Sequence, residues 1–481
     1  MSEHRVFAQR VGLIGITNLL IALSGIFLLP ILTKTLPIEE YGIWVQFMVT
    51  IGLIPSIIMF GLPYTMVRFL AGMEKIENIR EGFYSIAFVV LVTSTVASFL
   101  FFLPSKPIAT TLFDGNITIV RILSLVIFIK CINDVLLDFF RAFQRIKKFS
   151  IFTIMQTFLD FVLVAYFILS GYGIVFAAIG MLITRCFIFL IMARLIVSEI
   201  GVMVPKFTNI RDYLAFGLPT VPGNLSSWVV NSSDRYVIGV LLGTAFVGYY
   251  SPGYTLGSVI QMFLAPLGLI LPAILSKYYD ENKMDEAKTV LKFSLKYFLL
   301  LAIPSSFGLS LLSKPLLTIL STPEIASEGY LITPFVAISA VFFGASVVVT
   351  HIIVLEKKTT ITGSIYILAA VLNFGLNLVF IPYMGIIGAA VTTLVAYLSI
   401  FVAGTYYSFK YLKFDIDLHF ILKSIFASIV MSLVILRWNP EGLPNVLATV
   451  GVCAFVYAAV LLLLKGMTRE ELVFFKNLFR G

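Results

Sequence analysis

One stretch in the middle of the chain carries polar and charged side chains within a segment long enough to cross a membrane. Residues 216–239 read FGLPTVPGNLSSWVVNSSDRYVIG. The polar positions share one face of a predicted helix, because they recur every three or four residues: Asn224, Ser227, Trp228, Asn231 and Arg235. An ionisable group in hydrocarbon costs at least about 2.5–3.5 kcal/mol. This face must therefore look into protein or water, and we interpret it as one wall of a central cavity in a transporter.

Arg235 is the strongest candidate for contact with an anionic ligand. A guanidinium offers paired donors in a fixed geometry that suits phosphate or carboxylate oxygens. Two structural alternatives stay open: a local pair with the adjacent Asp234, or a place near the outer headgroups. Asn231, Asn224 and Trp228 lie on the same predicted face, and we expect them to be further substrate contacts.

A second set of charges lies on a predicted helix that begins near residue 117. Lys130, Asp134 and Asp138 are spaced four apart, and the ridge continues towards Arg141 and Arg145. One interpretation is an internally neutralised ladder of i,i+4 pairs. The other is functional: a stepping path for an anionic headgroup, with Lys130 as a substrate contact, or a site for a coupling cation at Asp134.

Asp160 and Arg185 lie at similar depth in two adjacent predicted spans. Their equal depth predicts a buried ion pair, because an unpaired partner would be costly there. If Arg185 faces the cavity instead, it becomes a second ligand for an anion. Asp160, like Asp134 and Asp234, is then either a coupling-ion site or a salt-bridge partner.

Composition identifies the class of protein that must position these side chains. The chain has 481 residues, of which 59% are hydrophobic and only 12% are charged, about half the charge of an average soluble protein. We therefore expect an all-α integral membrane protein. Its apolar runs predict fourteen transmembrane helices, which begin near residues 11, 42, 83, 117, 149, 172, 213, 247, 292, 331, 360, 384, 418 and 445.

The distribution of Lys and Arg predicts the orientation in the membrane. With the N-terminus inside, 26 of the 34 basic residues fall in inner segments and five in outer ones. Such a bias follows the positive-inside rule. We expect a multi-pass protein of the cell (cytoplasmic) membrane with both termini cytoplasmic and the first apolar segment retained. The net charge of +9 is then an orientation signal, and no nucleic-acid partner is expected.

The two halves of the chain contain matching motifs in the same order. Ser105-Lys106-Pro107 recurs as Ser313-Lys314-Pro315, and the run from Gly173 to Ala178 recurs from Gly385 to Ala390. A repeat of six spans preserves orientation, so the halves should be parallel copies, as in several transporter folds.

This repeat predicts three parts of the chain. They are an N-lobe of spans one to six (1–200), a C-lobe of spans seven to twelve (201–412), and spans thirteen and fourteen with a tail (413–481). The tail carries a capping box, Thr468 with Glu471, ahead of apolar residues. We expect it to form an amphipathic helix on the inner surface.

Several motifs resemble those of polysaccharide (O-antigen-type) flippases, members of the multidrug/oligosaccharidyl-lipid/polysaccharide (MOP) exporter superfamily. The motifs are Phe216–Pro219, Asn231–Gly239, Gly248–Ser251, Tyr172–Ile174 and Tyr383–Ile386. The resemblance implies a V-shaped, MATE-like pair of six-helix lobes and two extra C-terminal helices. It also implies alternating access that moves a polyprenyl-diphosphate-linked oligosaccharide from the cytoplasmic to the outer leaflet, in cell-surface polysaccharide biosynthesis. Implied partners are that lipid-linked oligosaccharide, the bilayer, and glycosyltransferases or a polymerase of the same pathway.

Two other functions are weighed against this one. A cation-coupled multidrug antiporter of the same superfamily would favour an acidic cavity, but the first span, Val11 to Thr33, contains no acidic residue. A membrane polysaccharide polymerase or ligase would need a large outer loop with catalytic residues, and the predicted outer loops are short. No catalytic, metal-binding or cofactor motif is recognisable. We therefore expect a transporter without cofactor or metal, and not an enzyme.

Overall fold

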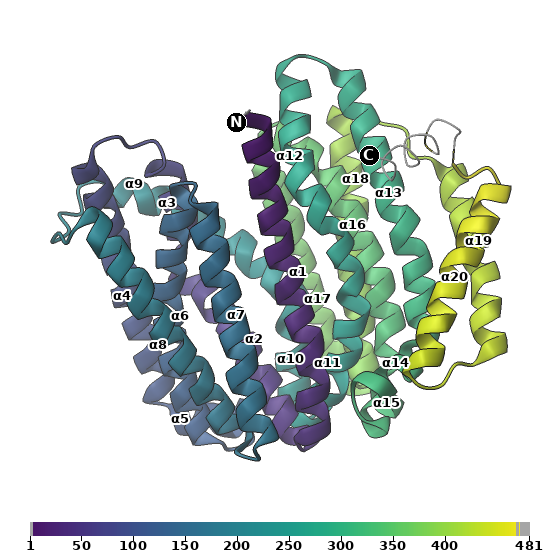
Figure 1. Ribbon diagram of the computed structural model, residues 1–481, viewed down its shortest axis with the longest axis horizontal. Helices are drawn as coiled ribbons and strands as arrows, with labels where there is room; N and C mark the ends of the chain where they lie inside the picture. The colour runs from purple at the N-terminus through teal and green to yellow at the C-terminus, as the bar shows by residue number, and fades with distance from the viewer. Residues whose placement is uncertain (1–2, 468–470, 472–481) are drawn as a thin grey trace. The chain divides into compact units, whose positions relative to one another are not determined.

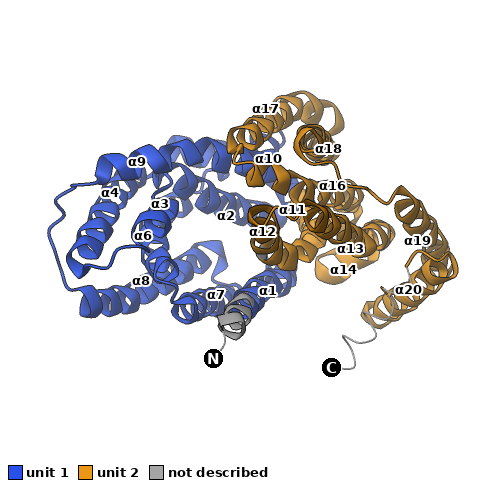
Figure 2. Cartoon of the chain, turned by 90° about the horizontal axis from the view of Figure 1, so that it is seen from above, with its two compact units in different colours: residues 1–248 blue, residues 249–481 orange. Residues whose placement is uncertain are grey.

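Helices account for the ordered elements of the described chain. The computed structural model describes residues 3–467 together with Glu471 (Figure 1). Within these residues there are twenty α-helices and two 3₁₀ segments, and no strand. The chain divides into two compact units, residues 1–248 and 249–481 (Figure 2).

The first unit contains seven long helices. They are α1 (Glu3–Thr35), α2 (Ile38–Ile58), α4 (Ile76–Phe102), α6 (Ile117–Ala142), α7 (Ile146–Leu169), α8 (Gly173–Ile200) and α10 (Val221–Leu241). Shorter elements connect them: α3 (Leu62–Phe69), α5 (Ser105–Leu112), α9 (Ile210–Gly217) and the 3₁₀ segment η1 (Leu218–Thr220). Within this unit α6 packs on both α4 and α8. Helix α7 packs on α8 and α1, and α10 packs on α2.

The second unit begins within α11 (Thr244–Ser258). It continues through η2 (Val259–Leu264), α12 (Ala265–Asp280), α13 (Met284–Leu311), α14 (Ser313–Leu320), α15 (Pro323–Gly329), α16 (Ile332–Leu355), α17 (Thr359–Met384), α18 (Ile386–Tyr411), α19 (Leu418–Trp438) and α20 (Leu443–Leu463). Here α16 packs on α13 and α18, and α17 on α18. The α19–α20 pair lies against α13.

This is a multi-pass membrane protein. Among the described residues, eleven helices are long and apolar enough to cross a membrane, or twelve if the bent pair Thr244–Gly268 and Ile270–Asp280 is one span. Every segment that the sequence predicts as a span is helical. The difference from fourteen lies in α6 and α10, because these helices carry the embedded charges and a polar face. That both of them cross the membrane stays a prediction.

The Ser-Lys-Pro repeat has the same local structure in each unit. Ser105 opens α5 and Ser313 opens α14, and both helices are eight residues long. Both serines are buried, and the Ser313 hydroxyl donates a 2.6 Å hydrogen bond to the Tyr330 carbonyl. The repeat in the sequence is therefore also a repeat of local structure. The boundaries predicted after residues 200 and 412 remain predictions, since the compact units divide at Gly248.

A close backbone approach joins α2 to the start of α11. A Cβ atom at Gly42 would lie only 1.9 Å from the Thr244 carbonyl oxygen. No side chain fits at that distance, so the two segments can meet only because residue 42 is glycine. Gly25 in α1 is the contrasting case, because no atom lies within 4 Å of the position its Cβ would take.

We expect Gly42→Ala to lower the free energy of unfolding by about 1–3 kcal/mol, since overpacking forces the backbone to shift. Thermal unfolding of the purified protein in detergent measures the loss. Gly25→Ala is the matched control and should leave the melting temperature unchanged or slightly raised. Equal destabilisation by both variants would contradict the close approach.

Candidate functional site

The polar face predicted around residues 216–239 lies on α10 in the first unit. Pro219 lies in the 3₁₀ segment η1 and Pro222 in the first turn of α10, where a missing N–H costs no hydrogen bond. The helix that follows is regular from Val221 to Leu241. The two prolines therefore affect only the start of the segment and leave the helix that carries the polar face intact.

Arg235 is buried and paired within its own helix. Its Nη1 lies 2.8 Å from Asp234 Oδ1 and donates a 2.9 Å hydrogen bond to the Asn231 carbonyl. The Arg235 side chain is 9% exposed and that of Asp234 is 1% exposed. The local pair with Asp234, one of the alternatives from the sequence, is therefore present. The guanidinium does not face lipid, and a role in binding an anion stays a prediction.

Helix α2 holds α10 in place through polar contacts. The Gln46 side-chain amide donates a 2.8 Å hydrogen bond to the Arg235 carbonyl, and the Thr50 and Tyr236 hydroxyls lie 2.5 Å apart. The Trp228 ring packs on Tyr236 with centroids 5.6 Å apart. Since Gln46 is fully buried, its bond to a main-chain carbonyl fixes the depth of Arg235 relative to α2.

The remaining predicted contacts on α10 are less enclosed. Asn224, Trp228 and Asn231 are partly buried, and the Asn231 side-chain amide donates to the Ser227 carbonyl at 2.7 Å. These side chains therefore share the face that the spacing predicts, between the start of α10 and the buried Arg235. Contact of any of them with a substrate stays a prediction.

The charged ridge on α6 contains two pairs within the helix, and Arg145, which follows the helix, pairs elsewhere. Lys130 Nζ lies 2.8 Å from Asp134 Oδ2, and Arg141 Nη2 lies 2.7 Å from Asp138 Oδ1. Arg145 pairs across to Glu199 in α8. Lys130 and Asp134 are only 22% and 28% exposed. This arrangement fits the neutralised ladder and leaves the ligand role of Lys130 and the coupling role of Asp134 as predictions.

The predicted ion pair between α7 and α8 is present. Arg185 Nη2 lies 3.5 Å from Asp160 Oδ2, and the side chains are 6% and 18% exposed. The Asn133 side-chain amide of α6 donates a 2.9 Å bond to the Arg185 carbonyl. Among the described residues, Nε and Nη1 of Arg185 have no hydrogen-bond partner. The site therefore keeps two buried donor nitrogens whose N–H groups water or an anion would satisfy.

Two buried amides in the second unit serve to join helices. Asn377 of α17 donates to Asn373 Oδ1 at 3.3 Å and accepts a hydrogen bond from the Thr392 hydroxyl of α18. All three side chains are fully buried. Interhelical hydrogen bonds of this kind hold membrane helices together, so these residues are accounted for by packing of α17 on α18.

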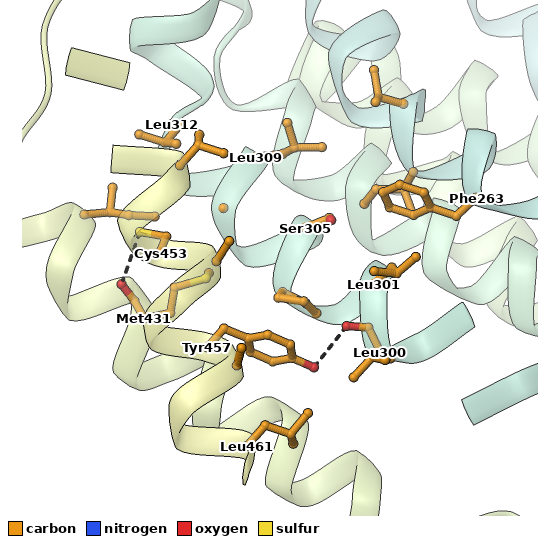
Figure 3. Close-up of a pocket in the computed structure, with 18 of the residues that line it drawn as sticks. Phe263, Leu300, Leu301, Ser305, Leu309, Leu312, Met431, Cys453, Tyr457 and Leu461 are labelled. Carbon is orange, nitrogen blue, oxygen red and sulfur yellow. Dashed lines mark hydrogen bonds between the residues drawn. The ribbon is translucent and has the colours of Figure 1, made fainter. Parts of the chain in front are cut away.

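An apolar cavity lies within the second unit, between α13, α19 and α20 (Figure 3). Its volume is about 820 Å³, at the upper end of the range for small-molecule sites. Its wall is formed largely by aliphatic side chains such as Leu300, Leu309 and Leu461. The polar end of Tyr457 is satisfied by the protein itself, because its hydroxyl donates a 3.0 Å hydrogen bond to the Leu300 carbonyl. A cavity with this lining can hold a hydrocarbon chain.

A buried charged cluster that was not singled out from the sequence lies elsewhere in the second unit. Lys296 of α13 is 7% exposed, and its Nζ lies 2.8 Å from Glu471 and 3.8 Å from Asp417. The one distinguishing signal of Lys296 was its position directly before the apolar run of α13. Of the predicted capping box, Thr468 lies outside the described residues.

Comparison with known proteins identifies the family. A family model described as "Polysaccharide biosynthesis protein" matches residues 7–276, and one described as MatE matches residues 219–379. The first match covers more than half of the chain, so the chain belongs to the polysaccharide biosynthesis protein family. The motifs quoted from the sequence resemble those of MOP-superfamily polysaccharide flippases, and this resemblance is confirmed. Two relatives of the chain are named as a flippase and a transport protein.

Individual relatives are similar over part of their length. The chain is 22% identical to the "Probable low-salt glycan biosynthesis flippase Agl15" of Haloferax volcanii over 44% of this chain and 45% of that protein. It is 23% identical to the "Succinoglycan biosynthesis transport protein ExoT" of Rhizobium meliloti over 60% and 58%. The chain thus spans about half the length of these curated relatives.

A solved structure supports the fold over the whole chain. The inward closed conformation of the lipid II flippase MurJ superposes with a TM-score of 0.71, covering 98% of this chain and 99% of that one. At 17% identity this likeness concerns the fold alone. The all-helical MATE- and MurJ-like fold is therefore established.

We expect Asp160→Leu to lower the free energy of unfolding by about 3–5 kcal/mol, because it leaves the Arg185 guanidinium buried without a counter-charge. Thermal unfolding in detergent measures the loss. Adding Arg185→Met should restore most of it. Asp134→Leu, which removes the partner of the more exposed Lys130, is the comparison and should cost less. If the double variant is no more stable than Asp160→Leu alone, the pair is not the cause.

Proposed function

We propose that this protein moves a polyprenyl-diphosphate-linked oligosaccharide from the cytoplasmic to the outer leaflet of the cell membrane by alternating access, during biosynthesis or export of a cell-surface polysaccharide. The observation that carries the proposal is membership in the polysaccharide biosynthesis protein family over residues 7–276. It is supported by the relatives named as a glycan flippase and a succinoglycan transport protein. The fold of a lipid II flippase is consistent with it.

The embedded cations suit the charged part of such a substrate. A diphosphate at depth needs positive side chains beside it, because an unpaired charge is costly there. Arg235, Arg185 and Lys130 are basic residues within membrane helices, and Arg185 keeps two buried donors without a partner among the described residues. We propose Arg235 as the first ligand and Arg185 and Lys130 as further ones. Asp134, Asp160 and Asp234 then balance these charges or bind a coupling cation.

The lipid and sugar parts of the substrate need different surroundings. The apolar cavity of about 820 Å³ in the second unit has the lining that an isoprenoid chain requires, since each buried methylene contributes about 0.8 kcal/mol. Sugar hydroxyls instead need polar partners, and the half-buried Asn224, Trp228 and Asn231 of α10 provide them. Trp228 adds an aromatic face for a sugar ring.

The proposal includes the arrangement predicted from the repeat. Two parallel six-span lobes, residues 1–200 and 201–412, would alternate in access, with α19 and α20 following as two extra spans. The matching helices α5 and α14 support two related lobes. The bias of Lys and Arg supports cytoplasmic termini. Glycosyltransferases or a polymerase of the same pathway are the proposed protein partners.

Arg235 allows a test that separates ligand binding from structure. We expect Arg235→Ala to abolish translocation of a lipid-linked oligosaccharide in proteoliposomes and in a glycan-export complementation assay. Because that variant also removes the guanidinium beside the buried Asp234 carboxylate, the deciding variant is Arg235→Ala with Asp234→Ala, which removes both charges. It should fold, as judged by its melting temperature, and still fail to translocate.

Recovery of translocation in the double variant would show that Arg235 serves only to neutralise Asp234. Arg235→Lys keeps the charge but loses the paired donors, and we expect it to retain a small fraction of activity. Arg437, a basic residue in the last turn of α19, is the matched control. Arg437→Ala should translocate at the wild-type rate.

The match of residues 219–379 to the MatE model favours one second candidate, a cation-coupled multidrug antiporter. The absence of acidic residues from Val11 to Thr33 argues against it, because cationic drugs need negative charge in the cavity. We expect expression in a drug-sensitive strain to leave the inhibitory concentrations of cationic drugs unchanged. A several-fold rise in resistance that depends on Asp134 or Asp160 would favour the antiporter.

A further inference from the structure

The segment between α8 and α9, residues 201–209, is a linker on the outside of the first unit. Seen from above, it runs from the end of α8 past α4 to α9 along the outer edge of that unit (Figure 2). It also begins where the first predicted lobe, residues 1–200, ends. Whatever surrounds this linker therefore surrounds the joint between the two predicted lobes.

Both ends of the linker are fastened to the N-terminal part of α4. The Tyr84 hydroxyl donates a 2.8 Å hydrogen bond to the Gly201 carbonyl. The Thr208 amide donates a 3.1 Å hydrogen bond to the carboxylate of the buried Glu81. Glu81 is also the last charged residue of α4, because residues 82–102 contain none. The linker is therefore held at the level where α4 enters the membrane.

Between these two hydrogen bonds the side chains alternate between two sides, as they do in an extended segment. Val202 and Val204 are 71% and 83% exposed. Met203 and Pro205, which alternate with them, are half-buried. The linker thus has an inner side that packs on the protein and an outer side that presents two bare valines.

Phe207 shows how far the linker reaches towards the membrane interior. Its ring packs edge-on against that of Phe88 in α4, with centroids 5.4 Å apart. Phe88 follows Glu81 by seven residues, about 10 Å along the helix. The linker itself lies outside the helices, so its main-chain N–H and C=O groups need water and cannot enter hydrocarbon. The aromatic side chain therefore reaches below the membrane boundary while the main chain stays at it.

We propose that residues 202–207 form an interfacial anchor, which docks on the inner surface of the lipid bilayer through Val202, Val204 and Phe207. Apolar side chains of interfacial segments reach about 5–10 Å into the boundary between headgroups and acyl chains. The exposed Lys206 extends its ammonium to the headgroups, as long basic side chains do. The distribution of Lys and Arg places the linker on the inner side. This anchor goes beyond the proposed translocation, because it concerns the bilayer rather than the cargo.

The bilayer is the occupant that the position of the linker favours. Val197 of α8 precedes Gly201 by four residues and is exposed, and so is Phe88 of α4. Both helices are long and apolar enough to cross the membrane, so these side chains face lipid. The valines of the linker continue that lipid-facing surface. A protein partner that covered Val202 and Val204 would have to displace lipid from both helices.

The test measures the depth of position 204 in the full-length protein. Val204→Cys is introduced after Cys131, Cys186 and Cys453 have been changed to alanine, and the protein is labelled with the fluorophore NBD in phosphatidylcholine nanodiscs. We expect lipids spin-labelled near the headgroup end of the acyl chain to quench the fluorescence more than lipids labelled near the chain end. Aqueous iodide should quench it weakly. Lys283→Cys, in the exposed turn between α12 and α13, is the control, and iodide alone should quench it.

Val202→Asp, added to the labelled Val204→Cys protein, tests the apolar contact itself. A carboxylate resists insertion, so iodide quenching at position 204 should rise roughly two-fold or more. Because Val202 is mostly exposed in the protein, the melting temperature in detergent should not change. Val202→Ile keeps the apolar side chain and is the matched control, which should leave the quenching unchanged.

Four results would overturn the proposal. Iodide quenching at position 204 as strong as at position 283 would place the linker in water. Shielding from both iodide and lipid would indicate contact with protein, and stronger quenching from the chain end would place the linker in the hydrocarbon core. Unchanged quenching after Val202→Asp would show that the valines do not hold the linker. Because the readout is depth in the bilayer, these results are independent of whether the protein translocates an oligosaccharide.

Discussion

Pairing of buried charges is the constraint on which the rest of this structure depends. Arg185 pairs with Asp160 and Lys296 with Glu471, and each of these side chains is less than one-fifth exposed. Removing one partner would leave an ion in a low dielectric, a loss larger than most single contacts can offset. Such pairs therefore fix neighbouring parts in register: α8 on α7, and Glu471 on α13. Arg235 differs, since its partner Asp234 is on the same helix. The register of α10 on α2 depends instead on the neutral bond from Gln46.

Much of the fold could be predicted because the bilayer restricts the choice of element. Backbone polar groups must be satisfied within each segment, so long apolar runs become helices, and every run predicted as a span is helical. The short helices α3, α5 and α9 were not predicted as elements. They have few residues, and their boundaries depend on packing rather than on apolar length. Gly61, for example, adopts a φ of 69° and lies against the Gly217 carbonyl. That fit depends on a distant segment of the chain.

The ion pairs of the candidate site could be predicted where the depth of a charged residue in the membrane is enough to identify its partner. Asp160 and Arg185 lie at equal depth on neighbouring spans, and they pair. For Arg235 the sequence left open a pair with Asp234 or a place near the outer headgroups. The structure shows the pair, buried beside α2, and helical periodicity alone could not have decided between the two. The contact of Lys296 with Glu471 joins residues 175 positions apart. No pattern along the chain relates them, because two residues so far apart in the sequence meet only through the tertiary fold of the second unit. The apolar cavity of that unit cannot be predicted from the sequence either, since leucines that line a cavity cannot be distinguished there from leucines that fill a core.

The six-residue 3₁₀ segment η2 between α11 and α12 couples rotation to length. A 3₁₀ helix has 3.0 residues per turn and rises about 2.0 Å per residue, against 3.6 and about 1.5 Å in an α-helix. If those six residues took up α geometry, α12 would turn by roughly 120° about its axis and draw in by about 3 Å. Pro266, in the first turn of α12, lacks the N–H that would continue an α-helical ladder across the junction. The 3₁₀ geometry of this segment therefore sets both the rotation and the axial position with which α12 begins.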